Sequence, residues 1–217
     1  MKDIVIVGAG GFAREVAWVI KDINSNKMTW SFLGYIESDA CQIGHPCGDS
    51  TVIGDDQWLL EQRKELNVVI AMGNLKTLDR IRQNLVKKPN LRFPNLIHPS
   101  TIWDRKRIQI EVGNVICANN IFTTDIRIGS FNLFNLASTY GHDDVIGNCC
   151  ALNPGVNISG RVTIGNRCLI GTGAVILENI TLGDDVIVGG GAVVTKNVDP
   201  GLTVVGIPAK PLVRNSA

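Results

Sequence analysis

The chain has 217 residues, of which 45% are hydrophobic, enough for one or two domains with buried cores. A formal net charge of +1 provides no general attraction to nucleic acid or to an anionic membrane surface. No apolar run approaches the roughly 18 residues of a membrane-spanning helix, and Met1-Lys2-Asp3 leads directly into an expected strand, not a signal peptide.

The six cysteines lack a C-x-x-C pair, and four of them fall within the repetitive part of the chain described below. Buried free thiols are therefore the expected state, with disulfide bonds or metal binding as the alternatives. A cytoplasmic protein without a metal site fits this pattern.

The first element expected is a buried parallel strand, Ile4-Val5-Ile6-Val7. It ends in Gly8-Ala9-Gly10-Gly11-Phe12-Ala13, which is G-x-G-x-x-A followed by a helical pattern. In that strand-turn-helix setting, backbone amides at a helix N-terminus can face a phosphate. The motif leaves three interpretations open: NAD binding, binding of a nucleotide-linked sugar, or a tight turn that serves only packing.

Two further strands are expected at 30–36 and 67–72, with helices near 56–64 and 77–86 and a last short strand at 91–96. The first two end in Glu37-Ser38-Asp39 and in Gly73-Asn74, at the sheet edge where such folds bind ligands. About 95 residues allow a half-size Rossmann-like sheet, which suits a mononucleotide better than a dinucleotide. We therefore expect an α/β domain over residues 1–97 that binds a nucleotide or acceptor.

From Ile110 to Asp199 the sequence repeats in hexads without a slip. The first place of each hexad is apolar or aromatic, the fifth is often small or β-branched, and glycine often follows the first. Such short strands bury their apolar face only by stacking, which predicts a parallel β-helix with three hexads per coil over residues 98–217. Glycine in the second place suits a tight corner, where a Cβ would clash or φ is positive.

His142 is the histidine best suited to chemistry, because Asp143 and Asp144 follow it next to an expected corner. A carboxylate can orient the ring and stabilise the imidazolium of a general base. The local sequence fits a surface histidine equally well. One full coil of three hexads, however, places Gly160 directly over His142, where a bare amide could approach a developing oxyanion.

Taken together, the short N-terminal domain, Gly141-His142-Asp143-Asp144-Val145-Ile146-Gly147, the hexads and the closing segment Val205 to Pro211 resemble the bacterial sugar O-acyltransferases. This family comprises sialic acid O-acetyltransferases and N-acetyltransferases of nucleotide-linked 4-amino sugars. The resemblance covers residues 1 to 214. It implies a left-handed β-helix that forms a homotrimer, with acetyl-CoA in the groove between neighbouring subunits.

The resemblance also implies residue roles. His142 would be the base, Asp143 its acidic partner and Gly160 the residue whose amide faces the acetyl group. The residues expected to contact the cofactor are Gly173, Gly190, Gly191 and Ala192 along the pantetheine, and Lys196 and Lys210 at the phosphates. Those expected to contact the nucleotide part of the acceptor are Gly8, Gly10, Gly11, Glu37 and Asn74.

One position departs from the family pattern. Members that act on nucleotide-linked amino sugars often carry a second histidine nine residues after the base, where this chain has Ala151. Asn153 is a candidate to replace it at the thioester carbonyl. The expected acceptor is the 4-amino group of a nucleotide-linked dideoxy sugar, and the alternative is O-acetylation of sialic acid or another polysaccharide sugar.

Three other functions are weighed against acetyl transfer. A hexapeptide-fold carbonic anhydrase needs three histidines around zinc, and only His142 lies within the hexads. An NAD-dependent oxidoreductase would need a larger sheet and a separate catalytic domain. A non-catalytic scaffold is the remaining alternative, because β-helices stack stably without performing chemistry.

Overall fold

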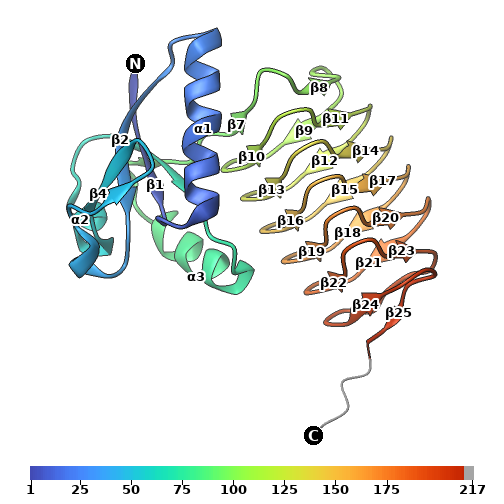
Figure 1. Ribbon diagram of the computed structural model, residues 1–217. Coiled ribbons are helices and arrows are strands. Elements are labelled where there is room, and N and C mark those ends of the chain that lie inside the picture. The colour runs from blue at the N-terminus through green and yellow to red at the C-terminus, as the bar shows by residue number, and fades with distance from the viewer. Residues whose placement is uncertain (213–217) are drawn as a thin grey trace, which may run out of the picture. The chain divides into compact units, whose positions relative to one another are not determined.

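The protein is described from a computed structural model over residues 1–212. It divides into two compact units, Met1–Pro99 and Ser100–Ala217 (Figure 1). The domain boundary expected between residues 97 and 98 lies two residues before this division, and the end of the second expected domain, residues 213–217, lies outside the described residues.

The N-terminal unit contains a six-stranded sheet with the order β3-β4-β2-β1-β5-β6. Its strands are β1 (Lys2–Val7), β2 (Trp30–Ile36), β3 (Pro46–Cys47), β4 (Ser50–Gly54), β5 (Leu66–Ile70) and β6 (Leu91–Arg92), and β7 (Leu96–Ile97) follows them. Its helices are α1 (Gly11–Asn26), α2 (Asp56–Glu61), α3 (Leu75–Leu85) and the short η1 (Ala40–Gln42). All pairings in the sheet are parallel except that between β3 and β4.

The central strand β1 is buried on both faces, and Ile4, Val5 and Ile6 are fully inaccessible to solvent. This burial explains why the strand reads as a continuous apolar run. The β-strand predicted at 30–36 is confirmed as β2, whereas the predicted helix at 56–64 ends earlier, at Glu61. The prediction missed the β3–β4 hairpin, although its two-residue turn, Gly48-Asp49, is a typical hairpin signal.

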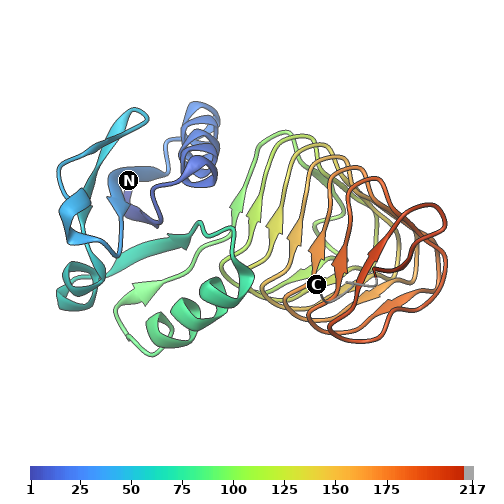
Figure 2. The same ribbon diagram turned by 60° about the horizontal axis from the view of Figure 1, so that its bottom comes forward.

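The C-terminal unit is a prism of short strands, as Figure 2 shows from nearer its end. The first face contains β10 (Val115–Ile116), β13 (Leu133–Phe134), β16 (Ala151–Leu152), β19 (Leu169–Ile170), β22 (Ile187–Val188), β24 (Thr203–Val205) and β25 (Lys210–Pro211). The second contains β8 (Ile102–Trp103), β11 (Ile121–Phe122), β14 (Thr139–Tyr140), β17 (Asn157–Ile158), β20 (Val175–Ile176) and β23 (Val193–Val194). The third contains β9 (Gln109–Ile110), β12 (Arg127–Ile128), β15 (Val145–Ile146), β18 (Thr163–Ile164) and β21 (Thr181–Leu182).

Successive coils pair in parallel register three hexads apart, as Tyr140 pairs with Ile158 and Ile158 with Ile176. The first residue of each hexad points into the prism, and Tyr140, Ile158 and Ile176 are all at most 4% exposed. The predicted fold class is therefore confirmed: an α/β Rossmann-like half domain precedes a left-handed parallel β-helix.

The corners of the prism show which of the two expected reasons for glycine in the second hexad place applies. Positive φ values occur in the fourth place of the hexads, for example at Asp143 with φ of 61° and Gly173 with φ of 68°. Glycine in the second place has a different cause, because a Cβ on Gly147 would lie 2.6 Å from the carbonyl oxygen of Gly165 in the next coil. Close stacking, and not a left-handed backbone, selects glycine there.

An aromatic cluster fills the interior of the prism at the coil that carries His142 and the coil before it. The ring of Tyr140 stacks on Phe122 at 4.3 Å and meets Phe134 edge-on at 5.3 Å. All three rings are at most 2% exposed. Because buried aromatic pairs have defined packing, this cluster holds the strand that leads into His142.

Candidate active site

His142 lies at the corner between the second and third faces, after β14 and before β15. Its Nδ1 is 2.8 Å from Oδ2 of Asp143, and the two side chains are 47% and 56% exposed. Because a carboxylate only accepts hydrogen bonds, Nδ1 carries the proton in this pair. In the neutral ring Nε2 is then the free base, able to take a proton from a bound nucleophile.

Gly160 stands directly over this imidazole. A Cβ on Gly160 would lie 2.7 Å from Nε2 and 2.8 Å from Cε1 of His142, so only glycine leaves room for the ring. The neighbouring Arg161 N–H donates to the His142 carbonyl at 2.8 Å. Gly160 is itself buried, and within residues 1–212 its N–H has no hydrogen-bond acceptor, so this group is unpaired beside the imidazole.

Two more coils of the same corner lead to the C-terminal end of the prism. Glu178 follows Gly160 in this column and pairs with Arg161 at 3.2 Å. Lys196 follows one coil later, which places it three coils from His142, or roughly 14 Å at ~4.8 Å per coil. Lys196 and Lys210 line the same pocket, whose volume is about 320 Å³. The two predicted phosphate-binding cations are thus brought together.

The other predicted cofactor residues occupy a different corner, between the first and second faces. Gly173 and Gly191 lie one coil apart there, with φ of 68° and 66°, and no atom lies within 4 Å of a Cβ built on either. Gly190 is exposed beside them. The N–H groups of Gly173 and Gly191 donate to the carbonyls of Pro154 and Thr172 at 2.9 and 2.8 Å, so it is their carbonyl groups that remain for a ligand.

Ala192 differs from these glycines. Its side chain is fully buried, its N–H donates to the Gly189 carbonyl at 3.2 Å and its carbonyl accepts from Val175 N–H at 2.9 Å. The backbone groups of Ala192 are thus used within the prism. Asn153 lies at the same corner as Gly173, one face away from His142.

A single prism consequently separates the two halves of the predicted site. His142, Gly160 and Lys196 share one corner, whereas Gly173 and Gly191 lie at the next, across the second face. One face consists of about six residues, or at most roughly 20 Å of extended chain. A compact groove lined by both the His142 corner and the Gly173 corner would therefore need one corner from each of two copies of the chain.

In the N-terminal unit, the predicted nucleotide residues gather at the carboxyl ends of β1, β2 and β5. Gly8 has φ of 109°, and a Cβ there would lie 2.7 Å from the carbonyl oxygen of Ala71. The carboxylate of Glu37 accepts from the Ala9 N–H at 3.1 Å, which attaches the end of β2 to the glycine-rich loop. Gly10 and Gly11 begin α1 at an exposed position.

Asn74 is exposed at the same sheet edge and has a structural role there. It is the N-cap of α3, and its Oδ1 accepts from the Thr77 N–H at 2.9 Å. Its side-chain amide group can still donate to a ligand.

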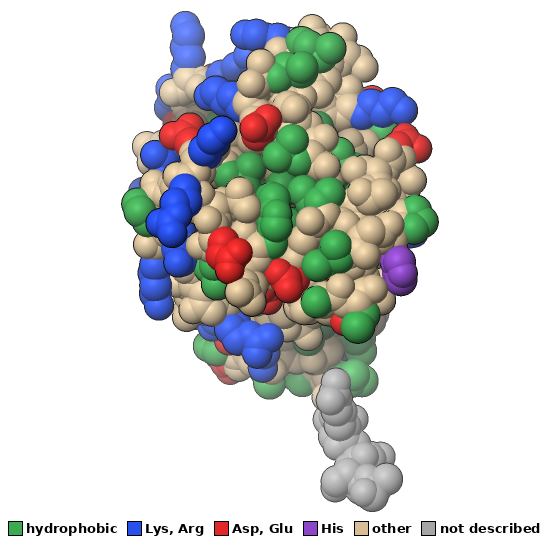
Figure 3. Space-filling view, turned by 90° about the vertical axis from the view of Figure 1, so that its left-hand side faces the viewer, with side chains coloured by type: hydrophobic (Ala, Val, Ile, Leu, Met, Phe, Trp, Pro, Cys, Tyr) green, Lys and Arg blue, Asp and Glu red, His purple; other side chains and the backbone are tan. Residues whose placement is uncertain are grey.

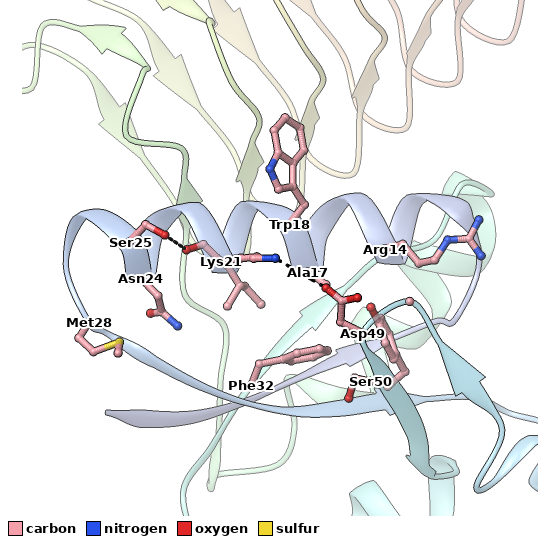
Figure 4. A pocket seen from close by; sticks show the side chains of 13 residues that line it. Arg14, Ala17, Trp18, Lys21, Asn24, Ser25, Met28, Phe32, Asp49 and Ser50 are labelled. Atoms are coloured by element: carbon pink, nitrogen blue, oxygen red, sulfur yellow. Dashed lines mark hydrogen bonds and ion pairs between the residues drawn. The ribbon is translucent and has the colours of Figure 1, made fainter.

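A separate pocket of about 510 Å³ lies between α1 and the strands β2 to β4. Figure 4 shows Arg14 and Lys21 along the helix, Met28 on the segment that follows it and Phe32 on the strand opposite, with Lys21 paired to Asp49 at 3.7 Å. None of the predicted nucleotide residues lines it. The pocket is therefore distinct from the glycine-rich loop.

The remaining histidines have structural partners. His98 lies 2.9 Å from Asp22 of α1 and packs against Trp18, and His45 is exposed 3.3 Å from Gln42. In residues 1–212 no group of three or more His, Cys, Asp or Glu side chains is placed to hold a metal ion. All six cysteines are free, and five are buried while Cys41 is exposed.

Surface charge and helix hydrophobicity are the features that would indicate binding to nucleic acid or to a membrane. Figure 3 shows both signs of charge on one face, with Lys and Arg side chains along one margin and Asp and Glu nearer the middle among hydrophobic side chains. No helix within the described range, residues 1–212, is long and apolar enough to cross a membrane.

Asp144 is the residue near His142 whose environment the sequence analysis missed. It is fully buried, and burial raises the pKa of its carboxyl to about 7 although the N–H groups of Val162 and Gly141 favour the charged form. The sequence did carry a sign of this burial, because Asp144 occupies the fifth hexad place, whose side chains face the interior of the prism.

Comparison with known proteins follows the two units. The family profile described as "PglD N-terminal domain" matches residues 3–88, and that described as "Bacterial transferase hexapeptide (six repeats)" matches residues 161–196. A sequence search among curated proteins gives no match.

Three solved structures are similar over the whole chain. WeeI from Acinetobacter baumannii AYE is 31% identical with a TM-score of 0.85, covering 98% of this chain and 100% of that one. The acetyltransferase domain of PglB from Neisseria gonorrhoeae, in complex with acetyl coenzyme A, is 27% identical with a TM-score of 0.87, covering 97% and 99%. PerB from Caulobacter crescentus, in complex with CoA and GDP-perosamine, is 26% identical with a TM-score of 0.82, covering 98% of each chain.

Proposed function

Because this chain belongs to the family of bacterial sugar acyltransferases built on hexapeptide repeats, we propose that it transfers an acetyl group from acetyl-CoA to a nucleotide-linked sugar. The proposed acceptor is the 4-amino group of a dideoxy amino sugar. The observation that carries the proposal is the geometry of His142. Its Nδ1 is hydrogen-bonded to Asp143, and its Nε2 lies beside Gly160, which has no side chain.

His142 acts as the general base in this reaction. Nε2 takes a proton from the acceptor amine as its nitrogen attacks the thioester carbonyl, and Asp143 stabilises the imidazolium. The tetrahedral oxyanion is stabilised by the Gly160 N–H. When the intermediate collapses, the carbon–sulfur bond breaks and the CoA thiolate leaves, and the imidazolium can return the proton to it.

The cofactor is proposed to occupy a groove between two subunits of a homotrimer. The complexes of the PglB domain with acetyl coenzyme A and of PerB with CoA support the cofactor. Gly173 and Gly191 offer their carbonyl groups and Gly190 its exposed backbone to the pantetheine, and Lys196 and Lys210 meet the phosphates. Ala192 is left out of this contact because its backbone groups are already bonded.

The nucleotide part of the acceptor is proposed to bind at the N-terminal unit. Gly8, Gly10 and Gly11 bring backbone close to a phosphate at the start of α1, and Glu37 and Asn74 offer polar side chains at the same sheet edge. The PerB complex with GDP-perosamine supports a nucleotide-linked amino sugar as the acceptor class. A cytoplasmic location stays a prediction.

O-acetylation of sialic acid or a related polysaccharide sugar is the second candidate. Ala151 favours it, because the second histidine common among the amino-sugar enzymes is replaced here by a buried alanine. Incubating the purified protein with acetyl-CoA and either a nucleotide-linked 4-amino sugar or sialic acid, and measuring CoA release with mass spectrometry of the product, decides between them. Acetylation of hydroxyl groups alone would overturn the amine proposal.

The role of His142 is tested in the same assay. We expect His142→Ala to lower kcat by ~10²-fold or more, because a general base contributes about that factor. The thermal unfolding midpoint should change little, since the side chain is about half exposed. A turnover near that of the wild type would exclude this histidine as the base.

A further inference from the structure

One column inside the prism contains an acid among aliphatic side chains. The residues in the fifth hexad place stack coil upon coil at the corner between the second and third faces. In this column the buried residues are Ile108, Ile126, Asp144, Val162, Ile180 and Val198. Asp144 belongs to the coil that carries His142, and its carboxyl is fully inaccessible to solvent.

The carboxyl of Asp144 is only partly satisfied. Its Oδ1 accepts from the Val162 N–H at 2.9 Å, whereas within residues 1–212 its Oδ2 has no hydrogen-bond partner. A buried polar atom without a partner is unfavourable, because it has lost its hydrogen bonds to water and gained none in the protein. The protein thus retains a group that an aliphatic side chain would replace at lower cost.

Neutral residues make the same coil-to-coil bond elsewhere in the prism. Asn132 accepts from the Cys150 N–H at 2.8 Å and donates to the Gly147 carbonyl at 2.9 Å. Ser138 accepts from the Val156 N–H at 3.0 Å. Polar bonding of coils is therefore a general device of this chain, and its use in an otherwise aliphatic column is what distinguishes Asp144.

The Asp144 bond joins the two successive coils that carry His142 and Gly160 at the same corner. Asp144 comes two residues after His142, and Val162 comes two residues after Gly160. Together with the bond from the Arg161 N–H to the His142 carbonyl at 2.8 Å, it fixes one coil over the next at this corner. A shift between these coils would move Nε2 relative to the Gly160 amide.

We propose that Asp144 is a positioning residue for acetyl transfer, which holds the His142 ring and the Gly160 N–H in register through its buried bond to Val162. This inference rests on the proposed function. It assigns Asp144 no contact with substrate, because the carboxyl is enclosed in the prism.

The test compares Asp144→Ala and Asp144→Asn with Asn132→Ala, which removes an equivalent bond at a corner without a histidine. We expect Asp144→Ala to lower kcat by about tenfold or more with both KM values within about twofold, because misplacement of reacting groups reduces the rate after binding. Asp144→Asn keeps an acceptor for Val162 and should restore most of kcat. Asn132→Ala should lower the unfolding midpoint while leaving kcat unchanged.

A measurement that does not depend on catalysis, the NMR signal of the His142 ring, separates this inference from the proposed function. The chain has three histidines, so imidazole NMR signals can be assigned by single substitutions. We expect the His142 signal to move in Asp144→Ala but not in Asn132→Ala. If the wild type transfers no acetyl group the proposed function fails, and the NMR comparison still decides the role of Asp144. An unchanged His142 signal in Asp144→Ala, or a kcat equal to that of wild type, would overturn the inference.

Discussion

At the residue scale, Gly160 determines whether the His142 ring can lie where the proposed reaction needs it. The Cβ of an alanine would come within 2.7 Å of Nε2, closer than real Cβ atoms approach other atoms, so the ring would have to move. A second consequence is chemical, because the same residue offers the free N–H for the oxyanion. The position of the ring therefore depends on the absence of a side chain at residue 160, whereas an alanine there would keep the N–H.

We expect Gly160→Ala to lower kcat by roughly 10- to 100-fold, since a displacement of about 1 Å costs up to that factor. Steady-state kinetics at saturating substrates measure it. Ser159→Ala, which removes an atom next to Gly160, is the control and should keep most of the activity. A kcat unchanged by Gly160→Ala would show that the ring position seen here is not the reactive one.

The buried Asp144 gives a pH dependence of stability whose sign follows from its raised pKa. Between its ordinary value of 3.8 and about 7, the native state holds a proton that the unfolded state releases. Stability should therefore fall as pH rises through this range and level off above it, by on the order of 4 kcal/mol for about three pKa units. The titratable neighbours His142 and Asp143 act in opposite directions, and the residues stacked in its column are aliphatic.

Asp144→Asn removes this titration. Denaturant unfolding at pH 5 and pH 8 should show a gain in stability for Asp144→Asn, relative to wild type, that is larger at pH 8. A difference between the two proteins that does not change with pH would mean that this carboxyl titrates normally.

At the scale of elements, the repeat itself could be predicted because every hexad obeys the same packing rule. Tyr140 and Ile158 occupy equivalent places three hexads apart, and this spacing alone placed Gly160 over His142. The pairing of His142 with Asp143 was expected from the family resemblance, and the two side chains do lie within hydrogen-bond distance. The local sequence alone could not show that Asp143, and not Asp144, faces the ring, because this depends on the backbone conformation at the corner. There Asp143 adopts a positive φ of 61°.

Other elements escaped prediction for identifiable reasons. The β3–β4 hairpin is so short that its apolar alternation carries little signal, and its Gly48-Asp49 turn is the only strong indication. Ala192 looked like its glycine neighbours in sequence, but it lies in the fifth hexad place and points into the core. The interior role of Asp144 could have been inferred from that same place in the hexad.

The last coils carry a prediction of their own, because Lys196 and Lys210 line one pocket. We expect Lys196→Ala and Lys210→Ala to raise KM for acetyl-CoA by about tenfold, the loss of one charged phosphate contact. The KM for S-acetylpantetheine, which lacks the adenosine phosphates, should not change. Lys106→Ala, in the loop between β8 and β9, is the matched control. Equal effects on both thioesters would place the CoA phosphates elsewhere.

At the scale of the whole molecule, the geometry of one prism bears on the assembly. The His142 corner and the Gly173 corner are separated by a face in each copy, so the proposed compact site would use one corner from each of two copies. In a closed ring of identical subunits every interface is the same, and each one would form a complete site. A monomer would have bases and cofactor grooves that do not meet.

Complementation between two inactive variants tests this central claim most directly. His142→Ala retains the Gly173 groove, and Gly173→Trp, which fills the open corner, retains the base. Co-expression in equal amounts should yield mixed oligomers in which about one quarter of the sites combine an intact base with an intact groove, and hence about one quarter of wild-type activity. Mixed oligomers as inactive as either variant alone would contradict a site shared between subunits.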